Sequence, residues 1–213
     1  MVIIYFSLAL LGFLSELISI TSLIKYGQLR LPEIWRPLLL LLSSGFLSDL
    51  ISFTIIIFLS GVNNYIILYA YCLIEIMSCF LIFYKLSRNM KEKMVLYFVG
   101  FIQISVFAVE LLFSRGDSNN FYSNVLNKLV FIIFSIMYAY KEYRSIVSIN
   151  YSLITFIVLL VLCFYSLSIF YYSLFEEVIK LEPSVYNVLW PIPMVSTILF
   201  NSIIGWALWR REN

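Results

Sequence analysis

Long runs of apolar residues follow one another along the chain and are separated by short polar stretches. A helix needs roughly 20 apolar residues to cross the hydrocarbon core of a bilayer. Seven runs reach that length, and they predict helices over residues 2–24, 37–60, 65–84, 94–113, 121–140, 151–173 and 186–209. Because the connections are short, consecutive helices are expected to be antiparallel neighbours. The pattern predicts an all-α bundle of seven transmembrane helices, forming a single domain over residues 1–213.

The composition agrees with a membrane protein and excludes two other classes. Hydrophobic residues make up 62% of the chain and charged residues only 12%, against about 25% charged residues in an average soluble domain. So few charges cannot cover a water-facing surface of this size, which excludes a soluble globule. The 19 Phe and 16 Tyr residues exclude a disordered chain, because such chains are poor in aromatic residues.

The basic residues predict the orientation in the membrane, since Lys and Arg collect in short cytoplasmic loops. Eleven of the fourteen basic residues fall on one side of the predicted bundle: Lys25, Arg30, Arg36, Lys85, Arg88, Lys91, Lys93, Lys141, Arg144, Arg210 and Arg211. The N-terminus is therefore expected outside and the C-terminus in the cytoplasm, as in a multi-pass protein of the bacterial inner membrane. No basic residue precedes Lys25, so the first helix is not expected to be a cleaved signal peptide.

An eight-residue segment occurs twice, once in each of the first two predicted helices. Residues 12–19 read GFLSELIS and residues 45–52 read GFLSDLIS, so that only Glu16 and Asp49 differ. The glycine, the two serines and the acid share one helix face. Small residues on such a face let membrane helices approach closely, and the two copies are expected to pack against each other.

Glu16 and Asp49 are both expected near the middle of the bilayer. Glu16 lies nine residues before Lys25, and Asp49 thirteen residues after Arg36, about 13 and 20 Å along the helix axes. The third helix contributes Glu75 at the same depth. The predicted polar site comprises Glu16, Asp49, Glu75 and Asn201 of the last helix, with Ser15, Ser48 and Tyr71 beside them.

Carboxyl groups in this position must face inward and find partners, because each costs roughly 2.5–3.5 kcal/mol at mid-bilayer. Ionisable residues inside a membrane are functional by default. We therefore expect a site for a proton, a cation or a small polar ligand. The alternative is structural: Glu16 and Asp49 share a proton and join their helices.

Two further charges lie nearer the outer boundary, where Glu110 and Lys128 are expected to form an ion pair or to extend towards the interface. The cysteines Cys72, Cys79 and Cys163 all lie within predicted helices and are expected to be buried. The chain contains no His, which excludes His-based metal sites and Ser-His catalysis. No metal site, cofactor or direct nucleic-acid contact is predicted.

The last helix contains two prolines near its start, at positions 191 and 193. A proline is tolerated in the first turn of a helix, so the helix is expected to begin at Pro191. A broken helix that lines an outward cavity is the alternative.

The order of these features resembles that of small, uncharacterised bacterial seven-helix membrane proteins, which are similar to the seven-helix input module of some sensor histidine kinases. The resemblance rests on Asp49, on Gly61-Val62-Asn63-Asn64, on Tyr71-Cys72-Leu73-Ile74-Glu75, and on the proline-rich start of the last helix with Asn201. It implies a sensing or regulatory role. Because only four residues follow Trp209, no kinase domain is expected, and the signal would pass to a separate protein on the cytoplasmic side.

The leading hypothesis is therefore a non-enzymatic sensing or regulatory module in the membrane, with the oligomeric state left open. A proton- or cation-coupled transporter or channel is the second hypothesis, since the repeat is similar to the inverted repeats of transporters. A membrane regulator or effector of an antiviral, CRISPR-associated system is a variant of the first. The last is an intramembrane carboxylate hydrolase of the lysoplasmalogenase type, because paired acids can activate water.

Overall fold

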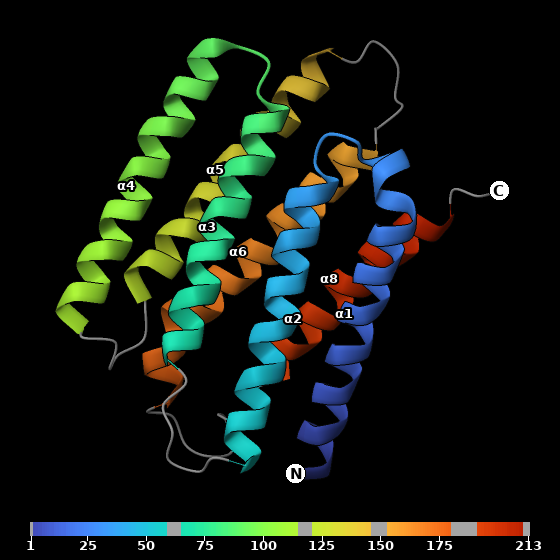
Figure 1. Cartoon of the computed structure of the whole chain (residues 1–213), viewed down its shortest axis with the longest axis vertical. Coiled ribbons are helices and arrows are strands. Elements are labelled where there is room, and N and C mark those ends of the chain that lie inside the picture. Colours follow the sequence, from blue (N-terminus) through green and yellow to red (C-terminus); the bar gives the residue numbers. More distant parts are fainter. Residues whose placement is uncertain (1, 59–64, 115–120, 146–152, 180–190, 211–213) are drawn as a thin grey trace. The chain divides into compact units, whose positions relative to one another are not determined.

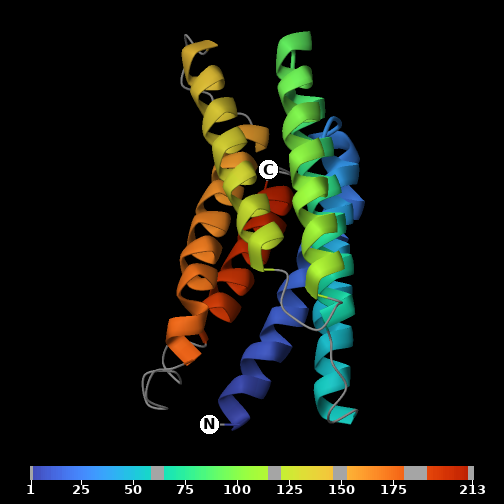
Figure 2. The same ribbon diagram turned by 90° about the vertical axis from the view of Figure 1, so that its left-hand side faces the viewer.

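A computed structural model describes residues 2–58, 65–114, 121–145, 153–179 and 191–210, and nearly all of these residues lie in helices (Figure 1, Figure 2). The helices are α1 (Val2–Arg30), α2 (Trp35–Phe58), α3 (Tyr65–Leu86), α4 (Met90–Ser114), α5 (Phe121–Ser145), α6 (Leu153–Ile179) and α8 (Pro191–Trp209). All seven are long and apolar enough to cross a membrane. The predicted all-α, seven-helix architecture is confirmed, and the described residues include no strand. The orientation of the termini stays a prediction.

The helices extend beyond the apolar runs that predicted them, mainly at ends that carry charges. The first helix continues past Lys25 to Arg30, and the fifth continues to Ser145. Long basic side chains can follow the helix surface while their charged ends reach polar surroundings, so a helix does not end where its apolar run ends. The described part of α8 begins at Pro191, and the expected start of the helix at this residue stays a prediction. The broken-helix alternative concerns the preceding residues, which lie outside the described ranges.

The chain divides into two compact units. One unit contains residues 1–31 and 131–213, and therefore α1, most of α5, α6 and α8. The other contains residues 32–130, with α2, α3, α4 and the first ten residues of α5. The single domain over residues 1–213 stays a prediction.

In the first unit α8 packs against both α1 and α6. α1 and α8 approach each other closely at Gly205, where an added Cβ atom would lie 2.9 Å from Ile18 Cγ2 and 3.6 Å from the Ser19 backbone nitrogen. The contact of α8 with α6 includes the stacked rings of Phe164 and Phe200, whose centroids are 4.4 Å apart. Gly205 therefore permits a contact between two backbones that a larger residue would block.

In the second unit α3 packs against α2 on one side and α4 on the other. A buried apolar cluster on α3 and α4 contains Tyr69, Cys72, Ile76 and Phe107. The rings of Tyr69 and Phe107 meet edge to face, with centroids 5.8 Å apart. Glu75 lies within this part of α3, ten residues from the helix start and about 15 Å along its axis.

Candidate functional site

Glu75 of α3 is the centre of a buried polar network in the second unit. Its Oε2 atom accepts a hydrogen bond of 2.8 Å from Asn127 Nδ2 of α5. The same oxygen lies 3.9 Å from Lys128 Nζ, the next residue of α5. The Tyr71 hydroxyl, one turn earlier on α3, lies 3.4 Å from the other carboxylate oxygen. One carboxylate thus joins two helices through an amide and an ammonium group.

The network continues to α4 and along α5. Gln103 Nε2 of α4 donates to Asn127 Oδ1 over 3.1 Å, which orients the amide so that its Nδ2 points at Glu75. Lys128 Nζ donates to Asn124 Oδ1, one turn earlier on α5. Glu75 and Lys128 are only 2% and 4% exposed, and both Gln103 and Asn127 are buried. Three helices therefore share one network of charged and amide side chains shielded from their surroundings.

The contact of α2 with α3 lies next to this network. A Cβ atom added to Gly45 of α2 would lie 3.8 Å from Tyr71 Cε2, in ordinary van der Waals contact. Ser48, one turn further along α2, is buried. The repeated segment of α2 thus places its small residues near the tyrosine that approaches Glu75.

The structure corrects the predicted pairing of Glu110 with Lys128. Lys128 contacts Glu75, whereas Glu110 accepts hydrogen bonds from the backbone N–H groups of Tyr122 and Ser123, at 2.9 and 2.8 Å. The Ser123 hydroxyl also donates to Glu110. A carboxylate is stabilised at a helix N-terminus by the unpaired N–H groups there. Glu110 therefore caps the N-terminus of α5, and the buried Lys128 contacts the carboxylate of Glu75 on α3 instead.

Asp49 is exposed on α2, but its expected partner Glu16 belongs to the other unit, so the inward orientation of Asp49 stays a prediction. Successive residues of an α-helix point about 100° apart, and Ser48 takes the buried direction. The sequence placed the acid on the same face as Gly45 and the two serines.

In the first unit Glu16 and Ser15 are buried, as predicted. Asn201 is buried on α8 and contacts α1, where its Oδ1 accepts a hydrogen bond of 3.0 Å from the Ser19 hydroxyl. Glu16 belongs to one unit and Asp49 and Glu75 to the other. The convergence of these three acids, and the packing of the two repeat copies, stay predictions.

Two of the three cysteines are buried as predicted, but Cys163 is exposed on α6. Its side chain is exposed on the surface of an apolar helix, where a small apolar residue is as suitable as it is in the core. The described residues hold no cluster of acidic and cysteine side chains that could bind a metal ion.

Sequence reasoning missed Gln103, Asn127 and Asn124, which complete the network. A search for charges and repeats passes over amide side chains. The signal was still present, because Gln103 lies near the middle of an apolar run, where an amide needs a hydrogen-bond partner. A list of every polar residue at mid-helix would have included it.

The comparisons add no relative to these observations: no family model, curated protein or solved structure matches the chain. The fold and the network define the class of protein. It is a multi-pass, α-helical membrane protein in which a carboxylate–ammonium pair is buried among three helices.

Proposed function

We propose that this chain is a sensing or regulatory module of the bacterial inner membrane, and that the Glu75 network is its responsive element. The observation that carries the proposal is the buried contact between Glu75 and Lys128, on two different helices. The amides of Asn127 and Gln103 extend the contact to a third helix.

A charge pair of this kind is a poor way to gain stability. Each ion costs several kcal/mol to remove from water, and apolar residues of similar size are often as stable or more stable. A helix bundle with 62% hydrophobic residues has no need of ions for packing. Ionisable residues inside a membrane therefore support a functional role.

The geometry supports a two-state response. Glu75 Oε2 is shared between an amide at 2.8 Å and an ammonium at 3.9 Å. A proton on Glu75, or a polar ligand that competes for Lys128, removes the attraction between α3 and α5. The other titratable groups of α3 on this side are Tyr71, Cys72 and Cys79, each about one turn from Glu75. A ligand or proton that favours one state shifts the population of both, and the change would reach a partner through the loops.

Hydrogen–deuterium exchange of the protein in nanodiscs tests the responsive element. We expect a change of pH to alter exchange in α3 and at the start of α5 in the wild type but not in Glu75→Gln. The exposed Glu33 supplies the matched control, and Glu33→Gln is expected to respond like the wild type. If the pH-dependent exchange of Glu75→Gln equalled that of the wild type, a sensing role of the network would be contradicted.

Cross-linking in native membranes tests the regulatory part. A photoreactive residue at the exposed Arg88, in the connection between α3 and α4, is expected to give a defined protein adduct. Its yield should change in Glu75→Gln and not in Glu33→Gln. An adduct that is equal in all three backgrounds would contradict signalling from the network to that partner.

The shared carboxylate also favours a second candidate, a proton- or cation-coupled transporter. A cation that binds Glu75 would displace Lys128 and be released when the ammonium returns. Proteoliposomes containing a pH-sensitive dye distinguish the two candidates. Proton flux that Glu75→Gln abolishes would favour transport, and its absence in the wild type would reject proton coupling.

A further inference from the structure

Basic and aromatic side chains lie together at the C-terminal ends of α1 and α8, two helices of the first unit that pack against each other. Lys25 Nζ and Arg30 Cζ of α1 lie 4.8 and 5.2 Å from the ring centroid of Tyr26. Arg210, directly after α8, has its Cζ atom 4.8 Å from the ring centroid of Trp206. We refer to Lys25, Arg30 and Arg210 as the α1–α8 basic cluster.

Arg30 joins the ends of the two helices. Its Nη1 atom donates to the backbone carbonyl of Leu208, in the last turn of α8. The last carbonyls of a helix have no partner within the helix, so the guanidinium satisfies one of them. A guanidinium carries five N–H donors in a planar fork, and the bond to Leu208 uses one of them. The same fork matches the oxygens of a phosphate group, which Arg binds through two parallel hydrogen bonds.

The exposed residues beside the cluster are typical of a membrane interface. Leu29, which precedes Arg30, is 85% exposed. Trp206 and Trp209 at the end of α8 are 49% and 65% exposed. Tryptophan at the ends of membrane helices lies at the depth of the lipid headgroups. The cluster is therefore expected at the depth of the phosphates.

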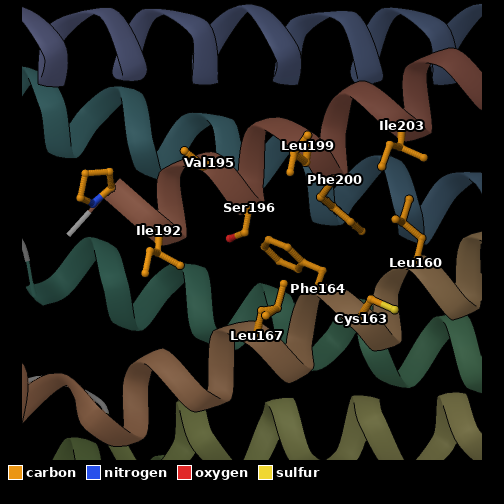
Figure 3. Close-up of a pocket in the computed structure, with 11 residues that line it drawn as sticks. Leu160, Cys163, Phe164, Leu167, Ile192, Val195, Ser196, Leu199, Phe200 and Ile203 are labelled. Atoms are coloured by element: carbon orange, nitrogen blue, oxygen red, sulfur yellow. The ribbon is translucent and has the colours of Figure 1, made fainter. Parts of the chain in front are cut away.

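The preceding part of α8 has a different character. It borders a groove shared with α6, to which α8 contributes residues from Pro191 to Ile203 (Figure 3). The described residues that line this groove include no charged side chain, and the Ser196 hydroxyl donates to the Pro193 carbonyl within α8. This part of α8 suits the depth of the acyl chains, whereas residues 206–210 suit that of the headgroups.

The charge of the two helix ends favours an anion. The sequence contains no Asp or Glu over residues 17–31 or 191–210. Arg211 and Glu212 lie outside the described residues, and with them the two ends carry four basic residues and one acidic residue. Like charges held close together repel each other, and an anion beside them offsets that repulsion.

We propose that the α1–α8 basic cluster binds the headgroup phosphate of an anionic phospholipid. Arg30 supplies the planar fork, and Lys25 and Arg210 add positive charge that favours a lipid with a net negative headgroup. The proposal does not depend on the Glu75 network, whose residues belong to the other unit. The bound phosphate would add a second connection between α1 and α8 beside the bond from Arg30 to Leu208.

Native mass spectrometry of the protein, released from nanodiscs with equal parts of phosphatidylglycerol and phosphatidylcholine, tests the proposal. We expect the wild type to retain phosphatidylglycerol in preference to phosphatidylcholine. A basic residue near the membrane surface strengthens the binding of anionic lipid about fivefold. The double variant Lys25→Gln with Arg210→Gln is therefore expected to retain phosphatidylglycerol about 25-fold more weakly, while Arg30 still caps α8. Retention equal to that of the wild type would overturn the proposal.

Two lysines of α4 supply the matched control. Lys93 Nζ also lies over a ring, 4.8 Å from the Tyr84 centroid, but Lys93 directly follows Glu92. Lys91→Gln with Lys93→Gln removes the same number of charges and is expected to retain lipid like the wild type. Equal losses in the two double variants would show a general effect of charge and would contradict a defined site.

Two further measurements test the chemistry of the site. Arg30→Lys keeps the charge and removes the planar fork, so we expect weaker retention of phosphatidylglycerol; unchanged retention would contradict binding through the guanidinium. Inorganic phosphate, added at constant ionic strength before release from the nanodiscs, is expected to leave the bound phosphatidylglycerol in place. Its displacement would mean a site for free anions and would overturn the assignment to a lipid.

Discussion

Removal of the buried ammonium gives the most direct measure of the Glu75 network. Lys128→Met keeps an unbranched apolar stem of similar size and deletes the charged end of the side chain. At 3.9 Å and an effective dielectric constant near 20, the attraction between the two charges is about 4 kcal/mol. Removing one partner of a buried pair leaves the other charge uncompensated and typically costs about 3–5 kcal/mol. We expect Lys128→Met to lower the free energy of unfolding by an amount in this range.

The double variant Lys128→Met with Glu75→Gln separates this cause from lost packing. Once both charges are gone, no uncompensated ion remains, and the amide oxygen introduced by Glu75→Gln can still accept the hydrogen bond from Asn127. We therefore expect the double variant to be more stable than Lys128→Met alone. Replacement of a whole buried pair is often neutral or stabilising.

Equilibrium unfolding in mixed micelles, followed by tryptophan fluorescence, measures both variants. Lys91→Met is the control, because Lys91 is exposed and surface substitutions usually change stability by no more than about 0.5 kcal/mol. Equal losses in Lys128→Met and the double variant would refute an origin in the charge pair. If Lys128→Met were as stable as Lys91→Met, the charge pair would make no contribution to stability, and the reasoning would be refuted.

Three other contacts give predictions from single substitutions. Gly205→Ala brings a Cβ atom to 2.9 Å from Ile18 Cγ2 and is expected to destabilise by about 1–3 kcal/mol in thermal unfolding. Gly12→Ala should have little effect, because a Cβ atom there meets no atom of the described residues within 4 Å; equal losses would reject the close approach. Glu110→Ala removes the cap of α5 and should cost about 0.5–2 kcal/mol, with faster hydrogen exchange confined to the start of that helix. Asn201→Leu loses its hydrogen bond to α1 and should cost about 0.6 kcal/mol by equilibrium unfolding, with no effect on the pH response of α3.

The helices were predictable because a helix that crosses a bilayer needs an apolar run of a minimum length, and this requirement does not depend on the details of the local sequence. The burial of Glu75 was predictable for a similar reason, since its neighbours Cys72 and Cys79 mark the same inward face. Its partners were not predictable. The rotation of α5 about its own axis decides whether Lys128 points towards α3 or α4. A rotation of a few tens of degrees is enough to change its partner from a residue of α3 to a residue of α4.

Asp49 is a second example of a side-chain direction that the sequence pattern does not determine. Gly45 lies against Tyr71 of α3 and Ser48 is buried, whereas the repeat predicted a contact of these small residues with the first helix. The repeat could not show how wide the contact face is. Asp49 lies about 100° around the helix from Ser48, which is enough to move a side chain from a buried face to an exposed one.

The two hydrogen-bonded contacts between helices differ in a way that bears on function. The contact of Asn201 with Ser19 joins neutral groups over 3.0 Å, beside the close approach of α1 and α8 at Gly205. Such a contact strengthens helix packing and has no charged state to change. The Glu75 contact holds two charges, and its longer distance to Lys128 leaves the carboxylate shared with Asn127. A proton or a ligand can alter the contact of Glu75 with Lys128. The contact of Asn201 with Ser19 contains no charged group on which a proton or a ligand could act. Loss of Asn201 should therefore change stability alone, whereas loss of Glu75 should change both stability and the response.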